Sequence, residues 1–557
     1  MFSVLPQTVR EADVSATEKY GVPALGLMKA AAKESLEYIY PHINRTSRVT
    51  ILCGKGNNAG DGYGVAYELV KQWYDVCVVN VFDTVPSSDQ ARTCYNDYIF
   101  SGGTVLNTQR AFSRIAASDV IIDAVFGIGF DGVINPDSEC GRMIECANSS
   151  HAYRIAIDVP SGINSADGTV KGSAFMANTT ITVSFIKTGT ISYPALEYCG
   201  EIVVADIIYP EKLAESLKAD ALIPDDEYIR KTIPVRRRNS HKGTFGKLAM
   251  LCGSRYMTGA AYFAALSAVR TGTGLVTLAA DEATLNILQT RIAEPVFFNT
   301  HGLCNEKSIT EITELFDGSD CALVGCGLGS GENIEKAVQH IIKNAKTKLV
   351  IDADGINALP GNINVLKEAA NTPVITPHPA EFARITGKTV AEVQSNRLNL
   401  ARQFAKDFSC VTVLKGASTV IASPDGRTAI NRSGNSGLAK GGSGDVLAGA
   451  VASFVCQGLD PFDAAVCAVY LHGKASDVLK HQISEYGMMP SDLPLAIAKL
   501  RLGGDSLFAG QCNDDPLALG QPVGLYDDRD RALLGIGLGR LGVLAEVVLG
   551  RGDPVCL

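Results

Sequence analysis

The most informative run of this sequence is Gly434-Asn-Ser-Gly-Leu-Ala-Lys-Gly-Gly-Ser-Gly-Asp-Val-Leu-Ala-Gly449. A glycine-rich loop leads into the apolar run Val446–Phe454, which predicts a buried helix. The backbone N–H groups of such a loop and the positive end of the helix dipole favour an anion, typically a phosphate. Asp445 lies in the first turn, where it could act as a general base beside a phosphoryl group. The alternative is a glycine turn that Asp445 only caps, but the order of strand, loop and helix favours a functional site.

Composition limits what the protein can be. The 557 residues allow two large domains or several smaller ones, and 46% hydrophobic with 20% charged residues is typical of a soluble globular protein. The net charge of −9 argues against non-specific nucleic-acid binding. The 15 cysteines are scattered without a Cys-x-x-Cys pair, so we expect neither a zinc site nor a disulfide scaffold, and a cytoplasmic location fits best. We expect no membrane span and no signal peptide.

The first half of the chain alternates short apolar segments with longer ones that suit helices. The expected strands are 48–53, 75–81, 120–123, 153–158 and 181–185. This alternation predicts a mostly parallel α/β sheet, which binds ligands at the carboxyl ends of its strands. Asn57, Asn58 and Asp61 follow the first strand in a glycine-rich segment, and their oxygens could hold a hard cation or a ribose. Asp123 and Asp158 each end a strand beside a glycine loop; one such Asp is commonly a helix cap, but two together predict a site.

These motifs resemble the NAD(P)H-hydrate epimerases, known by their YjeF N-terminal domain, over nearly all of residues 1–222. The resemblance implies a Rossmann-like fold, a bound potassium ion, and the hydrates NADHX and NADPHX as substrates. It implies that Asn58, Asp123 and Ser161 hold the potassium, and that Asp158 moves protons at the C6 hydroxyl as the hydrate ring opens and recloses. The implied substrate-lining residues are Asn57, Asn58, Ala59, Gly60, Asp61, Gly127, Ile128, Gly129, Phe130, Asp131, Gly132, Val133 and Asp158. The departures from the family pattern are Lys29, Ala59 and Ile128.

Residues 223–240 are polar and bounded by proline, which predicts a linker between two domains. A strand, a helix and a strand follow from 247 to 279 and begin a second doubly wound sheet. Asp352 and Asp354 end a later strand, where they could place magnesium or a ribose, or cap the next helix. His378 stands between two prolines at a strand end, which favours a substrate contact over the usual structural role of a lone histidine. Lys415 and the hydroxyl residues after it suit nucleotide phosphates.

Seven motifs of the second half resemble, in order, the ADP- or ATP-dependent NAD(P)H-hydrate dehydratases, which have a ribokinase-like fold. The motifs are His241-Lys-Gly-Thr-Phe-Gly246, Met257-Thr-Gly-Ala-Ala261, Gly325-Cys-Gly-Leu-Gly329, Asp352-Ala-Asp354, Thr376-Pro-His-Pro-Ala-Glu381, Leu414-Lys-Gly416 and Gly444-Asp445. The resemblance implies hydrate-binding residues Ala260, Gly327, His378 and Asp445. It implies that ADP or ATP, with magnesium, is held by Lys415, Gly416, Ala417, Ser418, Thr419 and Gly444. Cys326, Ala380 and Lys440 depart from the family pattern.

The sequence therefore predicts an α/β protein with two doubly wound sheets. We expect an epimerase domain at 1–222, a linker at 223–240 and a dehydratase domain at 241–502. A homo-oligomer is a further expectation from the resemblance. The tail 503–557 suggests no function, although 534–549 could form a short helix. Two alternatives stay open: a ribokinase-like kinase for a small alcohol, which would not explain the first half, and a first half that only binds a ligand or a protein.

Overall fold

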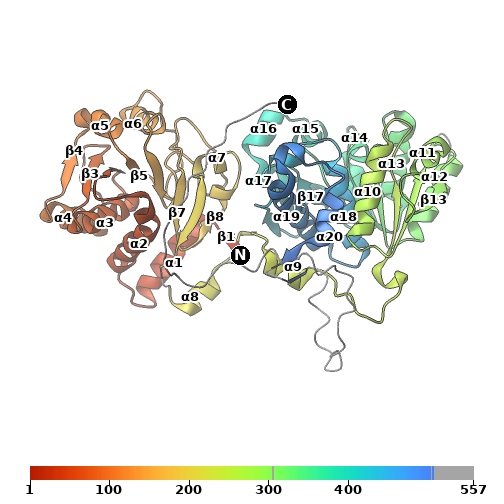
Figure 1. Cartoon of the computed structure of the whole chain (residues 1–557), viewed down its shortest axis with the longest axis horizontal. Coiled ribbons are helices and arrows are strands. Elements are labelled where there is room, and N and C mark those ends of the chain that lie inside the picture. Colours follow the sequence, from red (N-terminus) through yellow and green to blue (C-terminus); the bar gives the residue numbers. More distant parts are fainter. Residues whose placement is uncertain (208, 304–305, 503–504, 507–557) are drawn as a thin grey trace, which may run out of the picture. The chain divides into compact units, whose positions relative to one another are not determined.

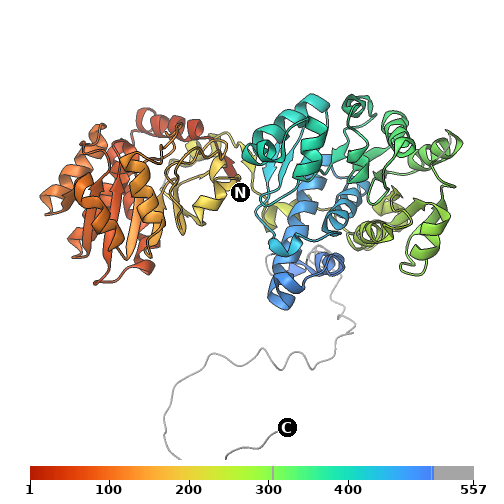
Figure 2. The ribbon, with the colours of Figure 1, turned by 90° about the horizontal axis from the view of Figure 1, so that it is seen from above.

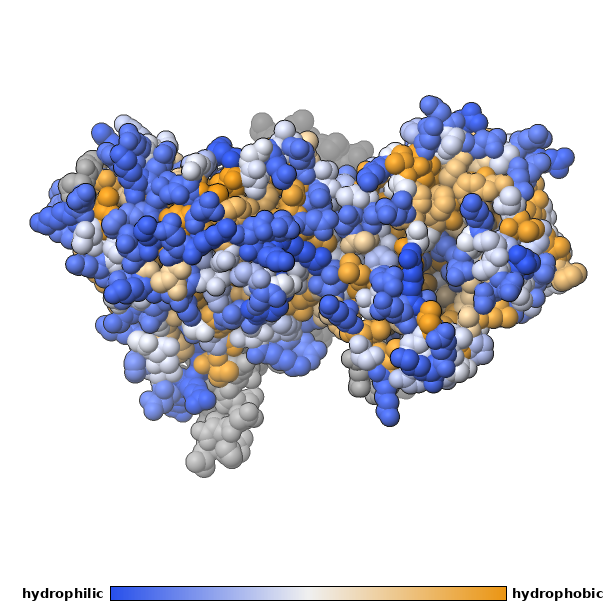
Figure 3. Space-filling model, turned by 180° about the vertical axis from the view of Figure 1, so that it is seen from behind, coloured by the Kyte–Doolittle hydropathy of each residue, from blue (hydrophilic) through white to orange (hydrophobic). Residues whose placement is uncertain are grey.

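The computed structural model describes residues 1–207, 209–303, 306–502 and 505–506, and the helix expected at 534–549 lies outside them. Two large sheets dominate, each with helices on both faces (Figures 1 and 2), which confirms the predicted α/β class. None of the described helices is long and apolar enough to cross a membrane. Figure 3 shows hydrophilic side chains over most of one face, with apolar side chains gathered in smaller patches between them.

The first sheet has seven parallel strands in the order β4-β3-β2-β5-β6-β7-β9. Their bounds are β2 Arg48–Cys53, β3 Asp75–Asn80, β4 Thr104–Leu106, β5 Val120–Ala124, β6 Tyr153–Ile157, β7 Thr179–Val183 and β9 Glu201–Ala205. The order runs outward in both directions from β2, so the chain changes direction between β2 and β5. At such a switch point the connecting loops part and leave a crevice at the carboxyl ends of the strands.

Side-chain alternation along the strands divides the helices of the first sheet between its two faces. Ile122 of β5 packs in a buried core with α2 and α3, whereas Ile121 packs in a separate core with α5 and α6. A third, smaller core joins α1 to Ile207 and Tyr209. The helices of this part are α1 Pro6–Glu18, α2 Ala24–Ile39, α3 Asn57–Lys71, α4 Asp89–Phe100, α5 Thr108–Ala116, α6 Glu139–Asn148, α7 Leu196–Cys199 and α8 Glu211–Ser216, with 3₁₀ turns η1 Tyr40–His42 and η2 Thr188–Ile191.

The second sheet begins with seven parallel strands in the order β13-β12-β11-β14-β15-β16-β17, and its switch point lies between β11 and β14. Strands β18 and β19 continue it antiparallel. The bounds are β11 Lys247–Leu251, β12 Leu275–Ala280, β13 Val296–Asn299, β14 Cys321–Val324, β15 Lys348–Ile351, β16 Val374–Ile375, β17 Val411–Leu414, β18 Val420–Ala422 and β19 Thr428–Ile430. A separate pair is formed by β20 Arg501–Leu502 and β21 Asp505–Ser506.

Side-chain alternation along the strands also divides the helices of the second sheet between its two faces. Met250 of β11 packs in a core with α10, α18, α19 and α20, whereas Leu251 packs with α12, α13, α15 and α17. The helices are α9 Asp226–Thr232, α10 Thr258–Arg270, α11 Glu282–Leu288, α12 Glu306–Asp317, α13 Glu332–Asn344, α14 Asp354–Asn357, α15 Pro379–Thr386, α16 Val390–Ser395, α17 Arg397–Phe408, α18 Ser443–Cys456, α19 Pro461–Gly487 and α20 Leu493–Lys499. The 3₁₀ turns are η3 Lys242–Phe245, η4 Ile363–Glu368 and η5 Ser436–Leu438.

Two expectations need correction. The second sheet is not built by the second half alone, because β10 (Ala221–Leu222), β1 (Phe2–Val4) and β8 (Ile186–Lys187) extend it beyond β19. The segment expected to be a linker contains helix α9, and its Ile229 and Ile233 are buried in the core of the second half. These two residues are four apart, so a single helical turn brings both to one face of an otherwise polar segment.

Both glycine-rich segments belong to their helices. Helix α3 begins at Asn57, and helix α18 begins at Ser443, before the apolar run that starts at Val446. Both first turns lie at the carboxyl edge of a sheet and consist of small and polar residues, of which Ala59 packs in a core. The N–H groups of a first turn have no intrahelical partner, so both helix starts can receive an anion or a polar ligand.

Gly449 sets the distance between α10 and α18. A Cβ at this position would collide with the carbonyl oxygen of Ala264, so Gly449→Ala must push the two helices apart. We expect it to lower the free energy of unfolding by about 1–3 kcal/mol, as overpacking does. Gly259 of α10 has open space around it, and Gly259→Ala should instead stabilise by ~0.5 kcal/mol. Thermal denaturation of both variants checks this, and equal midpoints would contradict the packing argument.

Candidate functional sites

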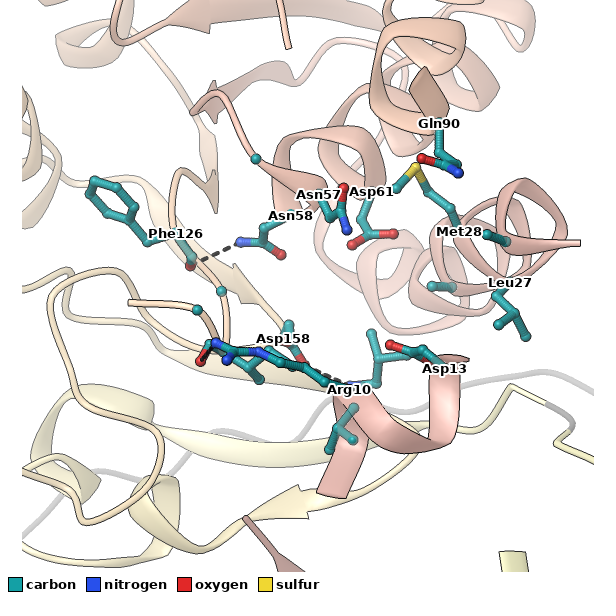
Figure 4. Close-up of a pocket in the computed structure, with 18 of the residues that line it drawn as sticks. Arg10, Asp13, Leu27, Met28, Asn57, Asn58, Asp61, Gln90, Phe126 and Asp158 are labelled. Atoms are coloured by element: carbon teal, nitrogen blue, oxygen red, sulfur yellow. Dashed lines mark hydrogen bonds between the residues drawn. The ribbon is translucent and has the colours of Figure 1, made fainter. Parts of the chain in front are cut away.

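A cavity of about 840 Å³ opens at the switch point of the first sheet (Figure 4). Most of the substrate-lining residues expected from the sequence do line it: Asn57, Asn58, Asp61, Gly127, Ile128, Gly129, Phe130, Asp131, Gly132 and Asp158. Three do not. Ala59 is buried in the core, Gly60 faces Met28 and Ala91, and the side chain of Val133 is 63% exposed.

Helices α1 and α2 close the cavity on the side away from the strand ends. They contribute Arg10, Asp13, Leu27 and Met28, which Figure 4 shows around the same space as Asp61 and Asp158. These residues were missed by the sequence analysis because they belong to an ordinary helical pattern far from every glycine motif. Sequence alone offers no signal that α1 lies over the carboxyl edge of the sheet.

Asp158 is held by a buried ion pair. Its backbone has φ +67°, a left-handed conformation that is costly for a residue with a side chain and that persists only where the surroundings impose it. The ammonium group of Lys187 donates to Asp158 Oδ1, and also to Thr182 Oγ1 at 3.1 Å and to the Val183 carbonyl at 2.9 Å. The Lys187 side chain is 1% exposed, so its charge must be matched by Asp158.

The three residues expected to hold potassium meet around Phe126. Asn58 Nδ2 donates to the Phe126 carbonyl at 3.0 Å, and the Phe126 N–H donates to Ser161 Oγ at 2.9 Å. Ser161 in turn donates to both carboxylate oxygens of Asp123, from Oγ and from its N–H, at 2.7 Å each. Burial raises the pKa of Asp123 to about 6 despite these donors. Asn58 Oδ1 is buried and has no hydrogen-bond partner among the described residues, so it can still ligate a cation.

The second site lies at the carboxyl ends of β14, β15, β16 and β17. Lys415 Nζ donates to Asp352 Oδ1 at 2.8 Å, and Thr376 Oγ1 donates to the same oxygen at 2.6 Å. The Cys326 thiol lies 3.6 Å from Asp352 Oδ2. Ligand atoms of Cys326, Asp352 and Asp445 all lie within 4.8 Å of one another. The glycine-rich start of α18 therefore brings Asp445 to the strand-end carboxylate.

The carboxyl group of Asp445 has a pKa close to neutral pH. Burial, followed by the nearby Asp352 carboxylate, raises the pKa of Asp445 to about 7. A carboxyl group with such a pKa exchanges protons easily at physiological pH. Of the two carboxylates that could hold magnesium or a ribose, Asp352 is clustered with Asp445, whereas Asp354 accepts from the Gly329 N–H at 2.7 Å and starts α14.

The predicted nucleotide loop follows β17 and lies beside the start of α18. Lys415 Nζ lies 3.4 Å from the place of a Cβ at Gly444, so the two ends of the predicted nucleotide site meet. Gly416, Ala417, Ser418 and Thr419 complete the loop, and Thr419 Oγ1 closes it by donating to the Gly416 carbonyl at 2.8 Å. Arg397 of α17, which the sequence analysis missed, is buried and donates to the carbonyls of Leu414 and Lys415 at 3.0 and 3.1 Å.

The remaining predicted hydrate contacts have visible structural roles. Ala260 and Gly327 pack together, since a Cβ at Gly327 would come within 2.7 Å of the Ala260 methyl group. His378 caps α15, with Nδ1 accepting from the Ala380 and Glu381 N–H groups at 3.1 and 3.2 Å. Its side chain remains 50% exposed, which leaves the Nε2 side open to a ligand as well as to Glu381.

Lys440 does not add charge to the start of α18. Its ammonium group donates to the carbonyls of Tyr486, at 2.7 Å, and Met488, and so holds the end of α19. The cation available to an anion at Gly444 is therefore Lys415. All twelve cysteines described by the structure are free thiols, in keeping with the expected lack of a disulfide scaffold.

Both halves of the chain match known protein families. Residues 248–499 match the family model described as NAD(P)H-hydrate dehydratase, and residues 24–189 match the YjeF-related protein N-terminus. A solved structure from Bacillus subtilis, titled ADP/ATP-dependent NAD(P)H-hydrate dehydratase co-crystallized with ATP/Mg²⁺, is 31% identical with a TM-score of 0.44 and covers 49% of this chain and 96% of its own.

Curated relatives cover nearly the whole chain. The bifunctional NAD(P)H-hydrate repair enzyme Nnr of Moorella thermoacetica is 33% identical over 506 residues, which is 88% of this chain and 95% of the relative. The protein of the same name from Escherichia coli is 30% identical over 486 residues, 87% of this chain and 91% of the relative. Because both halves match and these relatives are covered over more than nine tenths of their length, the chain belongs to the family of bifunctional NAD(P)H-hydrate repair enzymes.

Proposed function

We propose that the protein repairs hydrated NADH and NADPH. The first site, in residues 1–222, epimerises the R and S hydrates, and the second, in residues 241–502, dehydrates the S hydrate at the expense of ADP or ATP. The observation that supports this most directly is the meeting of Asp445, Asp352 and Lys415 at the start of α18. This arrangement combines a base whose pKa is near neutral pH, a cation and a helix N-terminus. Phosphoryl transfer to a hydroxyl group requires this combination.

In the dehydration, Asp445 takes the proton from the C6 hydroxyl of the hydrate. The oxygen then attacks the terminal phosphoryl group of the nucleotide, releasing AMP from ADP or ADP from ATP. Loss of the new phosphate from C6 and of a proton from C5 restores the ring double bond of NADH or NADPH. The ammonium group of Lys415 and the N–H groups at the start of α18 stabilise the negative charge of the transferred group.

The residues of the second site fit magnesium through oxygen. Asp352 offers a carboxylate, which magnesium prefers, whereas the Cys326 thiol is kept protonated by its hydrogen bond to Cys252 and by burial, which raise its pKa. When bound, magnesium would neutralise part of the phosphate charge. In the first site, Asn58, Asp123 and Ser161 offer only oxygens at a buried place, which suits potassium. That ion would fix the loop through Phe126 that borders the substrate.

The experiment that tests this function uses a mixture of R and S NADH-hydrate with ADP or ATP in turn, magnesium and potassium. NADH formation is followed by its near-ultraviolet absorbance. Recovery of NADH from both epimers faster than spontaneous epimerisation supports both activities. Recovery of the S fraction alone leaves the first site without the proposed activity. Formation of a stable phosphorylated product without NADH identifies a small-molecule kinase instead.

Asp445→Asn keeps the shape of the side chain but cannot accept a proton. We expect it to slow dehydration of the S hydrate by roughly 10²–10⁴-fold while leaving epimerisation unchanged. The NADH assay measures the first rate, and chromatographic separation of the epimers without nucleotide measures the second. Dehydration at an undiminished rate would remove Asp445 from its proposed role.

The pH dependence of dehydration follows from the pKa of about 7 for Asp445 in the free protein. The base must be deprotonated, so kcat/KM for the S hydrate should rise as pH increases through about 7 and level off above it. Initial rates with nucleotide and magnesium in excess, corrected for spontaneous decay of the hydrate, give this profile. A flat profile between mildly acidic and mildly basic pH would argue against Asp445 as the base.

Potassium should accelerate epimerisation through Asn58 Oδ1, which has no partner among the residues described. Replacing potassium by tetramethylammonium should slow the wild-type protein, and Asn58→Ala should abolish the difference between the two cations. Asn57→Ala is the matched control, because Asn57 lines the same cavity without contacting Phe126 and should keep the potassium effect. Equal wild-type rates in both cations would contradict the proposed ion.

A further inference from the structure

The cavity of the first site is lined by more carboxyl groups than cationic side chains. Three of its carboxyl groups, those of Asp13, Asp61 and Asp158, are partly shielded from solvent, whereas its other two, Glu18 and Asp131, are exposed. Figure 4 shows Asp13, Asp61 and Asp158 directed into one space from α1, α3 and the end of β6. Each shielded carboxylate needs a donor or a positive charge nearby, or it must hold its own proton.

Two of the three carboxylates have such a donor. Lys187 forms the ion pair with Asp158, and the Tyr209 hydroxyl donates to Asp13. No side chain of the described residues donates to Asp61. The cavity thus holds one shielded ammonium group for three shielded carboxyl groups, and the group without a partner is Asp61.

The other cations that line the cavity are directed elsewhere. Arg10 Nη2 donates to the Ile128 carbonyl at 3.4 Å, on the opposite wall from α3. Lys55 Nζ lies 5.9 Å from the centre of the Phe82 ring. Neither forms an ion pair with Asp61 in the described structure. Burial, followed by repulsion from Asp158 and Asp13, raises the pKa of Asp61 well above its usual range. This shift favours the protonated form of the Asp61 carboxyl group, which can donate a proton.

We propose that Asp61 is the proton donor of the epimerisation and works opposite the Asp158–Lys187 pair. This inference rests on the proposed function of the first site. Acid–base catalysis at one carbon requires two groups in different environments, and here Asp61 has no donor among the described side chains whereas Asp158 is paired with Lys187. The glycine-rich segment would then contribute a catalytic group in addition to ligand-binding amides.

The chemistry balances without a further reactant. C6 of the hydrate bears the hydroxyl group and the ring nitrogen N1. Asp158 accepts the hydroxyl proton, the O–H electrons form the carbonyl bond, and the C6–N1 bond breaks with its electron pair moving to N1. Asp61 gives its proton to N1. Rotation about the C5–C6 bond presents the other face of the aldehyde, and N1 attacks it. The proton on N1 then returns to Asp61 and the proton on Asp158 to the new hydroxyl, so both residues regain their starting states.

The test uses the full chain without nucleotide, so that no dehydration occurs. The substrate is the R hydrate, separated from the S hydrate by chromatography, and the same chromatography follows conversion of R to S. We expect Asp61→Asn to lower kcat by roughly 10²–10⁴-fold with KM changed by only a few-fold. Glu11→Gln is the matched control, since Glu11 is an exposed carboxylate of α1 outside the cavity, and it should keep the wild-type rate.

The outcomes separate the inference from the function on which it rests. A wild-type protein that does not convert R to S faster than buffer refutes the proposed function. Wild-type conversion with an Asp61→Asn kcat near the wild-type value refutes only the role of Asp61. An effect confined to KM makes Asp61 a binding residue and also refutes it. If Asp13→Asn abolishes conversion while Asp61→Asn does not, the donor is the Asp13–Tyr209 pair.

Discussion

A buried lysine–aspartate ion pair at the carboxyl edge of each sheet is the interaction on which both sites depend. Lys187 is paired with Asp158 in the first sheet, and Lys415 with Asp352 at 2.8 Å in the second. Removing one member would leave an uncompensated charge in a shielded place, which typically costs about 3–5 kcal/mol. The ion pairs therefore fix the loops after the strands, including the left-handed turn at Asp158.

Each ion pair also defines the electrostatics of a neighbouring aspartate. Asp61 and Asp445 stand in the early turns of α3 and α18, next to a carboxylate whose counter-ion is already engaged. Burial and that carboxylate together raise the pKa of both residues. The two sites, on sheets with different connections, therefore share one arrangement. In each, a lysine is paired with the aspartate at a strand end, and the aspartate at a helix start exchanges protons. The arrangement follows from the shared geometry of switch points, where strand ends and helix starts converge.

Much of this was accessible from the sequence because it is local. The run from 48 to 53 predicted a strand, and β2 spans Arg48–Cys53. Glycine motifs placed Asn58, Asp123 and Ser161 on separate strand ends, and the structure joins them through Phe126. Asp445 was placed correctly in the first turn of α18, although the apolar run that identified this helix begins only at Val446, because the small and polar residues before it lack the apolar period by which a helix is recognised.

What could not be predicted depends on contacts between distant segments. Asp13 and Tyr209 meet in the first site although 196 residues separate them, and each is unremarkable in its own segment. Strands β1, β8 and β10 have two or three residues each, too few for an alternating pattern. Their partners decide their conformation, so the assignment of a sheet to each half of the sequence was wrong at this edge.

That edge joins the two activities in a way the motifs do not show. Lys187, the cation of the first site, lies in β8, which pairs with β1 and through β10 with β19 of the second sheet. The expected boundary at residue 222 coincides with the pairing of Leu222 with Ala429. Cutting the chain there would remove β19 and expose the edge of β10, the strand with which β1 pairs. The first site thus takes its charge from a strand of the same sheet that carries the second site, and this shared sheet gives a structural reason for keeping the two halves in one chain.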